Sequence, residues 1–337
     1  MKRKRIAFIG VGIFALRGKN PTMPALVRLL NNLSVDYDIT VYRLSKGEID
    51  KPSFRVRSLP FSFLPVRINY LLILFLFVLE HFRKRFVVIN ALSAKPAGRM
   101  AVTLSKLFNI PVVLHLHAAE AIAMPEHNYG DILTPETKRL TLQICSDVAL
   151  TTVLSGFHKR AIEEHIPFSR QVEVINHGCD TNLFSFEPKK IGSPLRILFV
   201  GYDEAVKCPE KALKVFSLIS KETKASLTMI GRGLNEKRFA SENISLQNVV
   251  FQETFTHAEM KDLFHSHDFL LITSFYESQS AVAIEAMSCG VLVCGTHVGV
   301  LADLSGIACT TVPVNECESL AKEIINLSKD LIHDSRS

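Results

Sequence analysis

The sequence lacks several features that would place it in a specialised class of protein. Its 337 residues contain no tryptophan and seven cysteines, none of them in a Cys-x-x-Cys pair. An odd number of scattered cysteines in a chain of this length argues against a disulfide framework and favours a reducing compartment. Cys289, Cys294 and His297 lie close together, but cysteines in apolar runs are more often buried core residues than metal ligands. No metal site is expected.

Long apolar runs and dense basic repeats are also missing. The basic start Met1–Arg5 precedes an apolar stretch too short for a secretory signal. The longest apolar run, Tyr70–Leu79, has ten residues, and about 20 are needed to cross a bilayer. The net charge of +6 suits anionic partners, but no zinc-finger spacing or aromatic-and-basic pattern points to nucleic acid. We therefore expect a cytoplasmic protein with no nucleic-acid partner.

Short apolar runs alternate with helical patterns along the chain. The runs are rich in Val, Ile and Leu on both faces, which is typical of strands buried in a parallel sheet. We expect strands at 6–10, 39–44, 54–59, 86–90, 111–116, 147–153, 172–176, 196–200, 226–230, 249–251, 269–273 and 291–295. Helices are expected at 24–33, 68–82, 96–108, 135–145, 155–165, 209–221, 257–266, 281–289 and 317–330. Such alternation predicts doubly wound parallel sheets.

The alternation is interrupted once, which divides the chain into two α/β halves. Gly178, Pro188, Gly192 and Pro194 fall within the interruption. We expect a first Rossmann-like domain over 1–178, a linker over 179–195 and a second Rossmann-like domain over 196–337. Ligands of such sheets bind at the carboxyl ends of the strands, so two facing halves predict an interdomain cleft.

The segment from Ser274 to Gly290 carries the most chemical information. A buried strand ends near Ser274, a polar loop follows, and a helix begins near Ser280. A helix N-terminus offers unpaired N–H groups to an anion, while Glu277 and Glu285 could accept hydrogen bonds from sugar hydroxyls. These features suit a sugar nucleotide, although an ordinary loop and a solvated helix face would show the same spacing.

Several segments together resemble the family-4 retaining glycosyltransferases, which have the two-domain GT-B fold. The Glu277-to-Glu285 spacing is similar to that family's Glu, seven residues, Glu motif. Further similar segments occur in the family order at Val112–Glu120, Val174–Phe184, Ile197–Gly201 with Lys207, and Leu227–Gly233. The resemblance extends from about residue 110 to 300 and implies a hexosyltransferase that uses a nucleotide sugar.

The resemblance also implies roles for particular residues. Glu285 would bind the donor ribose, Lys207 would neutralise the diphosphate leaving group, and His117 and Glu277 would act at the transferred sugar. Because His115 lies on the same strand face, spacing alone does not decide which histidine reaches the site. The main-chain amides of the loop and helix start would hold the diphosphate; these belong to Gln279, Ser280, Ala281 and Val282. Glycine turns that would face donor or acceptor are Gly12 and the run Gly231, Arg232 and Gly233.

The chain departs from the family pattern at several positions. Tyr202 replaces the Arg that usually follows the Gly of Phe-Val-Gly, and Cys208 and Ala118 replace glycines. The sequence ends shortly after the last expected helix, so the final crossover helix is expected to be short or absent. These departures keep open a non-catalytic scaffold, and a sugar-nucleotide epimerase on the same fold is a further alternative.

Two other motifs receive a structural interpretation. The run Gly10-Val-Gly12 matches a dinucleotide fingerprint, but no acidic residue follows the next strand, so a tight glycine turn is favoured over NAD(P) binding. Asp36 and Asp38 spell Asp-x-Asp, but they fall at a helix-to-strand turn, where Asp is favoured for local reasons. No cofactor is expected.

The resemblance therefore implies a retaining transfer of a hexose from a UDP- or GDP-sugar to a glycan or lipid-linked acceptor. The expected setting is cell-envelope polysaccharide or glycolipid biosynthesis. The apolar segment 68–85 ends in basic residues, so it either contacts the inner face of the membrane or is a buried helix with a solvated end.

Overall fold

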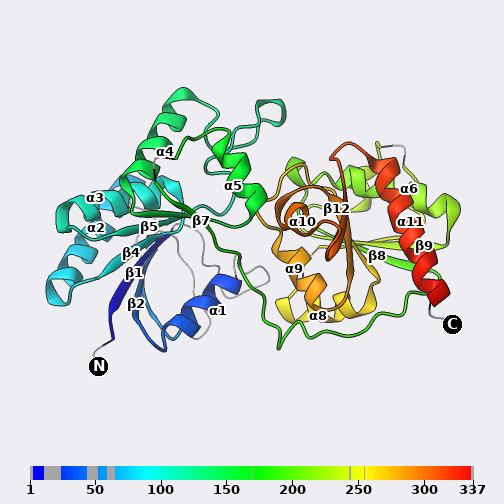
Figure 1. The fold of residues 1–337 in the computed structure, drawn as a ribbon, viewed down its shortest axis with the longest axis horizontal. Helices are drawn as coiled ribbons and strands as arrows, with labels where there is room; N and C mark the ends of the chain where they lie inside the picture. The colour runs from blue at the N-terminus through cyan, green and yellow to red at the C-terminus, as the bar shows by residue number, and fades with distance from the viewer. Residues whose placement is uncertain are drawn as a thin grey trace. The chain divides into compact units, whose positions relative to one another are not determined.

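The computed structural model describes residues 3–10, 24–43, 52–58, 65–168, 170–242, 244–253 and 255–334. The contacts divide the chain into two compact units, Met1–Asn176 (unit 1) and His177–Ser337 (unit 2). Figure 1 shows a twisted sheet with helices on both of its faces in each unit.

Unit 1 contains a parallel sheet of seven strands in the order β3-β2-β1-β4-β5-β6-β7. The order reverses between β1 and β4, which is where a doubly wound sheet binds its ligands. The strands are β1 (Arg5–Gly10), β2 (Asp38–Arg43), β3 (Arg55–Ser58), β4 (Val88–Ala91), β5 (Val112–His115), β6 (Leu150–Val153) and β7 (Val172–Val174). The helices are α1 (Pro24–Leu33), α2 (Val66–Arg83), α3 (Arg99–Phe108), α4 (Pro135–Asp147) and α5 (Gly156–Glu163), with short turns at Ala94–Gly98 and Pro125–His127.

Unit 2 contains a parallel sheet of six strands in the order β10-β9-β8-β11-β12-β13, and its order reverses between β8 and β11. The strands are β8 (Leu195–Val200), β9 (Ala225–Ile230), β10 (Val249–Gln252), β11 (Phe269–Ile272), β12 (Leu292–Thr296) and β13 (Cys309–Val312). The helices are α6 (Pro209–Glu222), α7 (Glu236–Phe239), α8 (His257–Ser266), α9 (Ala281–Ser288), α10 (Gly299–Leu304) and α11 (Cys317–Asp334), with a short turn at Ala205–Lys207.

Alternate residues of the unit 2 strands enter two separate cores. Phe269 and Leu271 of β11 pack with α6 and α11, whereas Leu270 and Ile272 pack with α8, α9 and α10. Because successive side chains of a strand point to opposite faces, a strand covered on both sides must be apolar at every position. This burial explains the apolar runs in the sequence and confirms the doubly wound fold.

The ends of two helices agree with their sequence patterns, and three short elements of unit 2 were missed. Thr256 and Glu259, three residues apart as a capping box requires, form that box at the start of α8, and Gly290 follows α9 with a φ of +82°. The sequence did not predict α7, α10 or β13. All three are short, and α10 begins at Gly299 without a capping side chain, so none of them leaves a strong local pattern.

The segment expected to be a linker packs on unit 2. Phe184 is fully buried in the core beneath α9, and its carbonyl accepts a hydrogen bond from the Ser288 hydroxyl at 2.7 Å. The contacts divide after Asn176, two residues before the expected end of the first domain. Assignment of 179–195 as the connecting segment stays a prediction. Across the described ranges, no helix has the length and apolarity needed to span a membrane.

Candidate functional site

Unit 2 brings two oppositely charged side chains together at its topological switch point. Lys207 follows β8 and Glu277 follows β11, the two neighbouring strands between which the order reverses. The Lys207 Nζ lies 2.7 Å from the Glu277 Oε1, and both side chains are largely shielded from solvent. The sequence predicted both residues for the site but not this ion pair, because 70 residues separate them.

The two loops that carry this pair are hydrogen-bonded to each other. The Thr273 hydroxyl lies 3.0 Å from the carbonyl oxygens of Lys207 and Cys208, and the Phe275 N–H donates to the Val206 carbonyl at 3.0 Å. Cys208 has a φ of +47°, a left-handed conformation that glycine adopts at lower cost. The backbone at Cys208 therefore explains the glycine of the family pattern, and this chain holds the same turn with a larger residue.

Glu277 is held by a second side chain as well. The Ser274 hydroxyl donates to the Glu277 Oε1 at 2.7 Å, and Glu277 is nine-tenths buried. A carboxylate shared by an ammonium and a hydroxyl has a fixed orientation. Ser274 is a site residue that the sequence did not single out, although its position three residues before Glu277 at a strand end was the available signal.

The N-terminus of α9 follows the same loop. No described side chain caps this helix, and its N-cap Ser280 has a φ of +75°. The Ser280 hydroxyl is buried and has no hydrogen-bond partner. Ala281 and Val282 supply the first N–H groups of the helix, and Glu285 lies half-buried in its second turn. Uncapped N–H groups and an unsatisfied hydroxyl fit an anionic ligand.

Gln279 has a role that its sequence position did not predict. Its side-chain oxygen accepts from the His177 N–H at 2.9 Å, and its side-chain nitrogen donates to the His177 carbonyl at 2.7 Å. Its main-chain carbonyl accepts from the Val300 N–H at 2.9 Å, beside Gly299, which leaves no room for a side chain. Gln279 thus ties the loop to two other segments of unit 2.

The glycine turn after β9 lies next to the loop after β8. A Cβ on Gly231 would come within 1.7 Å of the Gly201 carbonyl oxygen, so only glycine permits this approach. Arg232 is exposed, and its guanidinium lies 5.4 Å from the centre of the Tyr202 ring. The Arg232 guanidinium therefore lies beside position 202, where the family pattern has Arg and this chain has Tyr.

Unit 1 presents two stacked histidine rings near its own switch point, with centres 5.9 Å apart. Both ring nitrogens of His115 meet side chains of neighbouring strands, at 3.0 Å from the Asn90 Oδ1 and 2.7 Å from the Thr152 hydroxyl. The His117 Nδ1 faces the Leu92 carbonyl at 3.3 Å, and since a carbonyl only accepts, this nitrogen carries a proton. The contacts of His115 favour a structural role for it and leave His117 as the candidate for chemistry.

The turn after His117 is fixed by a buried carboxyl group. Glu120 accepts from the Ala118 N–H at 2.7 Å and from the His117 N–H, and burial raises its pKa despite these hydrogen bonds. The buried His158 lies against the same turn and accepts from the Leu154 N–H, and burial lowers its pKa to about 4. His158 therefore stays neutral at physiological pH, and its place in a helix pattern gave no sign of this contact.

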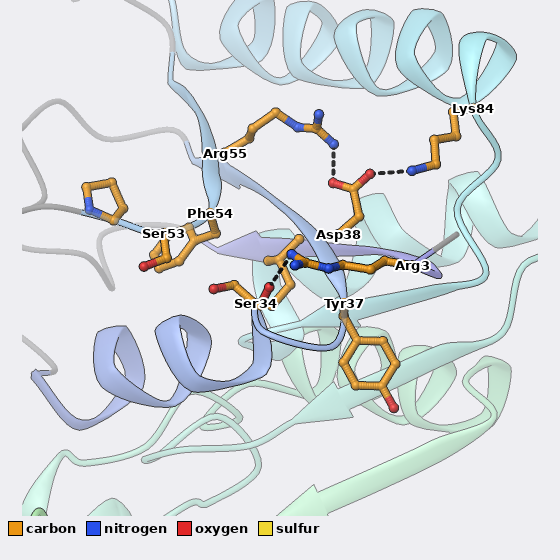
Figure 2. A pocket seen from close by; sticks show the side chains of 10 residues that line it. Arg3, Ser34, Tyr37, Asp38, Ser53, Phe54, Arg55 and Lys84 are labelled. Atoms are coloured by element: carbon orange, nitrogen blue, oxygen red, sulfur yellow. Dashed lines mark hydrogen bonds and ion pairs between the residues drawn. The ribbon is translucent and has the colours of Figure 1, made fainter. Parts of the chain in front are cut away.

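The remaining candidate residues lie elsewhere. Gly12 falls outside the described residues. Asp38 lies at the opposite edge of the unit 1 sheet, beside a hollow of about 490 Å³, where Arg55 and Lys84 converge on its carboxylate (Figure 2). Burial raises the pKa of Asp38, but the hydrogen bond from Lys84 and the charge of Arg55 outweigh this and hold it below its usual value. These contacts agree with a structural role for Asp38, and Asp36 lies in the turn between α1 and β2.

The cysteines that suggested a metal site are buried. Cys289 and Cys294 have no exposed surface, and desolvation raises the pKa of the Cys289 thiol to about 11. The exposed His297 is bonded through its Nδ1 to the Thr311 hydroxyl at 2.9 Å. In the part of the chain that the structure describes, no three His, Cys, Asp or Glu side chains are grouped as metal ligands would be.

Both units match known glycosyltransferase families. Residues 25–183 match the family described as Glycosyltransferase Family 4, and residues 194–330 match Glycosyl transferases group 1. The chain belongs to the family-4 glycosyltransferases.

Proteins of known sequence and structure support this assignment. The chain is 24% identical over 227 residues to the D-inositol 3-phosphate glycosyltransferase of Corynebacterium jeikeium, covering 60% of this chain and 54% of the relative. It is 21% identical over 236 residues to glycogen synthase of Mycobacterium tuberculosis, covering 67% and 57%. The alignments thus span little more than half the length of these relatives.

Solved structures share the fold over nearly the whole chain. Sucrose-phosphate synthase from Thermosynechococcus elongatus has a TM-score of 0.80 at 18% identity and covers 98% of this chain and 90% of its own. Anabaena HepE in complex with UDP has a TM-score of 0.75 at 18% identity, covering 97% and 90%. These similarities confirm the GT-B fold that the sequence motifs implied.

Proposed function

We propose that the protein transfers a hexose from a UDP- or GDP-sugar to a glycan or lipid-linked acceptor, with retention of the anomeric configuration. The observation that carries this proposal is the pairing of Lys207 and Glu277 at the unit 2 switch point, beside the uncapped N-terminus of α9. A cation next to free N–H groups suits a nucleoside diphosphate. The related HepE structure holds UDP, which agrees with a donor of this class.

The unit 2 residues divide the binding of the donor among them. Lys207 would stabilise the negative charge that develops on the leaving diphosphate, together with the main-chain amides of Ala281 and Val282. Glu277 would accept hydrogen bonds from hydroxyls of the transferred sugar, and Glu285 from those of the ribose. Because an ammonium and helix amides supply the counter-charge, we propose a reaction without a metal ion.

Arg232 would supply a second positive charge. In the family pattern an Arg follows the Gly of Phe-Val-Gly, whereas this chain has Tyr202 there. The guanidinium of Arg232 lies over the Tyr202 ring and so reaches the same loop from the next strand. We propose that this cation contributes to the diphosphate site and compensates for the substitution at 202.

Unit 1 would provide the acceptor side. Among its described residues, His117 is the candidate for contact with the transferred sugar, and its turn is held by Glu120 and by the neutral His158. An acceptor hydroxyl would attack on the face of the departing diphosphate, whose leaving oxygen would take part in accepting the proton. Assembly of a cell-envelope polysaccharide or glycolipid, at the cytoplasmic face, would use such a reaction.

Thermal stabilisation by ligands tests the proposal directly. The purified chain would be melted with UDP, GDP, their common hexose conjugates and NAD(P), with EDTA present. A ligand at 100 times its dissociation constant stabilises by about 2.7 kcal/mol, so a clear shift with one nucleotide and its sugar is expected. A shift with NAD(P) alone, or with none of the nucleotides, would contradict the proposal.

Two variants make this measurement specific. Glu285→Gln should weaken binding of the responding nucleotide about tenfold or more, since it removes a charge-assisted acceptor. Glu222→Gln changes an exposed carboxylate at the far end of α6 and serves as the matched control. Consumption of the sugar nucleotide without any acceptor would favour an epimerase instead.

A further inference from the structure

One face of α2 exposes large apolar side chains to solvent. Ile68, Leu71, Phe75, Leu79 and Phe82 are 42%, 65%, 57%, 40% and 76% exposed. Their spacing of three or four residues places them on one side of the helix, in a stripe that runs from its first turn to its last. We call these five residues the α2 stripe.

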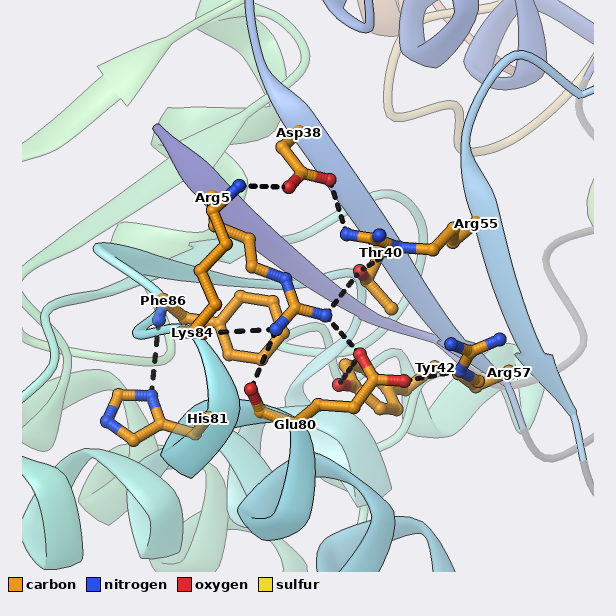
Figure 3. Close-up of polar contacts among 10 residues, drawn as sticks. All are labelled: Arg5, Asp38, Thr40, Tyr42, Arg55, Arg57, Glu80, His81, Lys84 and Phe86. Carbon is orange, nitrogen blue, oxygen red and sulfur yellow. Dashed lines mark hydrogen bonds and ion pairs between the residues drawn. The ribbon is translucent and has the colours of Figure 1, made fainter. Parts of the chain in front are cut away.

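The opposite face of α2 is firmly attached to the unit 1 sheet. Ile73 and Phe77 are buried, and Phe77 packs on Tyr42 of β2 with ring centres 5.4 Å apart. Near the end of the helix, Arg5 donates to the Glu80 carbonyl at 2.8 Å, and both Arg5 and Arg57 pair with the Glu80 carboxylate (Figure 3). This attachment fixes the orientation of the helix, so the stripe must face away from the sheet.

The charged residues of α2 that face solvent all have one sign. Arg67 in the first turn and Arg83 in the last turn are exposed, and so is Arg85 just after the helix, while Lys84 pairs with Asp38 of β2. The one acidic residue of α2, Glu80, is buried and neutralised by Arg5 and Arg57. The solvent-facing side of α2 therefore combines apolar side chains with positive charge at both ends and has no carboxylate.

We propose that the α2 stripe docks on the surface of a bilayer containing anionic lipids, with Arg67, Arg83 and Arg85 contacting the headgroups. Burial of the apolar helix face at the membrane surface favours binding through the hydrophobic effect, and the negative surface potential of the membrane attracts each basic residue. The helix lies on the membrane and does not cross it, because its other face packs on the unit 1 sheet.

The charge pattern distinguishes a bilayer from a second copy of the chain. If the stripes of two copies packed against each other, antiparallel helices would place Arg67 of one copy near Arg83 of the other. Parallel helices would place each arginine near the same arginine of the other copy. In both arrangements α2 has no exposed carboxylate to pair with these arginines. Like charges at an interface oppose association. An anionic lipid surface provides the missing negative charge.

Vesicle flotation of the full chain tests this docking surface. Vesicles of phosphatidylcholine with phosphatidylglycerol are compared with vesicles of phosphatidylcholine alone. The unmodified chain should bind the anionic vesicles and be released by salt. Leu71→Ser, Phe75→Ser and Phe82→Ser together should weaken binding at least about 30-fold, because three large side chains no longer enter the interface.

Charge variants and controls complete the experiment. Arg67→Gln with Arg83→Gln should weaken binding to anionic vesicles about 25-fold, at roughly fivefold for each charge. Val35→Ser with Ile307→Ser removes two exposed apolar residues outside α2 and should leave binding unchanged. Melting temperatures near that of the unmodified chain would show that the stripe variants fold.

Three results would overturn the proposal. The first is that the unmodified chain fails to float with anionic vesicles. The second is that the triple serine variant floats as well as the unmodified chain. The third is a dimer in lipid-free solution, measured by light scattering, that the triple serine variant converts to a monomer; this would assign the stripe to a second copy.

Discussion

Units 1 and 2 have the same strand order around their switch points, but their carboxyl edges carry different chemistry. Unit 2 places an ion pair, an uncapped helix N-terminus and a glycine turn after neighbouring strands. Unit 1 places histidines, a buried carboxyl group of raised pKa and a neutral His158 at its edge. We propose that the unit 2 edge binds a diphosphate and that the unit 1 edge binds uncharged hydroxyl groups.

The contrast teaches that the fold sets where a site can form, while short loops decide what it binds. The two sheets differ little in topology, yet their loops differ in charge, capping and exposure. Unit 1 also exposes the apolar face of α2, whereas the long helix α11 of unit 2 buries Leu320, Ile324 and Ile325 against α6 and the sheet. Substitutions in one unit that leave the other unit unchanged test this difference.

The largest effect is expected from Lys207→Met. Loss of the ammonium removes the charge that stabilises the leaving diphosphate and leaves the buried Glu277 carboxylate with Ser274 alone. We expect transferase turnover to fall about 10²- to 10³-fold, measured by release of the nucleoside diphosphate. Lys214→Met, which removes an exposed lysine of α6, is the control. Near-normal turnover in Lys207→Met would end the assignment of unit 2 as the donor unit.

A pH effect on folding is expected from unit 1. The pKa of His158 is lowered by burial to about 4 in the folded chain, against 6.5 when exposed, so the unfolded chain binds the proton first. The neutral histidine therefore contributes its full stability above pH 6.5, and about 3 kcal/mol of this is lost as the pH falls to 4.

Urea unfolding at several pH values measures this loss. His158→Gln, which keeps a side chain able to accept a hydrogen bond, should be less stable at neutral pH but should lack this part of the pH dependence. An identical decline in both proteins between pH 6.5 and 4 would assign the loss to other groups.

His117 and His115 should separate into a chemical and a structural role. His117→Ala is expected to reduce turnover about tenfold to 100-fold with little change in donor affinity, measured by steady-state kinetics and calorimetry. His115→Ala should mainly lower stability, by about 1–3 kcal/mol, because Asn90 and Thr152 lose a partner. The reverse pattern would show that His115 faces the substrate.

The smallest effect is expected from Arg232→Ala. This guanidinium is exposed and reaches the loop after β8 only through the Tyr202 ring, so its charge is partly screened. Donor affinity should fall about fivefold, and the difference should shrink at high salt. The double change Tyr202→Arg with Arg232→Ala should restore affinity if the two positions serve the same diphosphate.

Much of the fold could be predicted from the sequence. Strands buried on both faces need apolar residues at every position, so an apolar run such as Phe269–Ile272 indicates a buried strand. The capping box of Thr256 and Glu259 fixed the start of α8, since it depends on four consecutive residues alone. Short elements such as α10 and β13 left no comparable pattern.

The candidate site was predicted less completely. The resemblance to the family motifs pointed to Lys207, Glu277 and Glu285, and the structure brings Lys207 and Glu277 together at one edge of the sheet, while the donor-binding roles stay predictions. The resemblance could not identify Ser274, the side-chain contacts of Gln279 with His177, or the contact of Arg232 with Tyr202. Each of these contacts depends on backbone positions that are set by packing.

The sequence by itself determined two apolar, doubly wound sheets, the glycine turns and the order of the polar loops, because strand burial and turn conformation are local demands on residue type. The tertiary structure alone decided which polar side chains meet. It paired Lys207 with Glu277, fixed His115 between two strands, and turned one face of α2 outward. These outcomes follow from the crossing of distant segments, which no local pattern encodes.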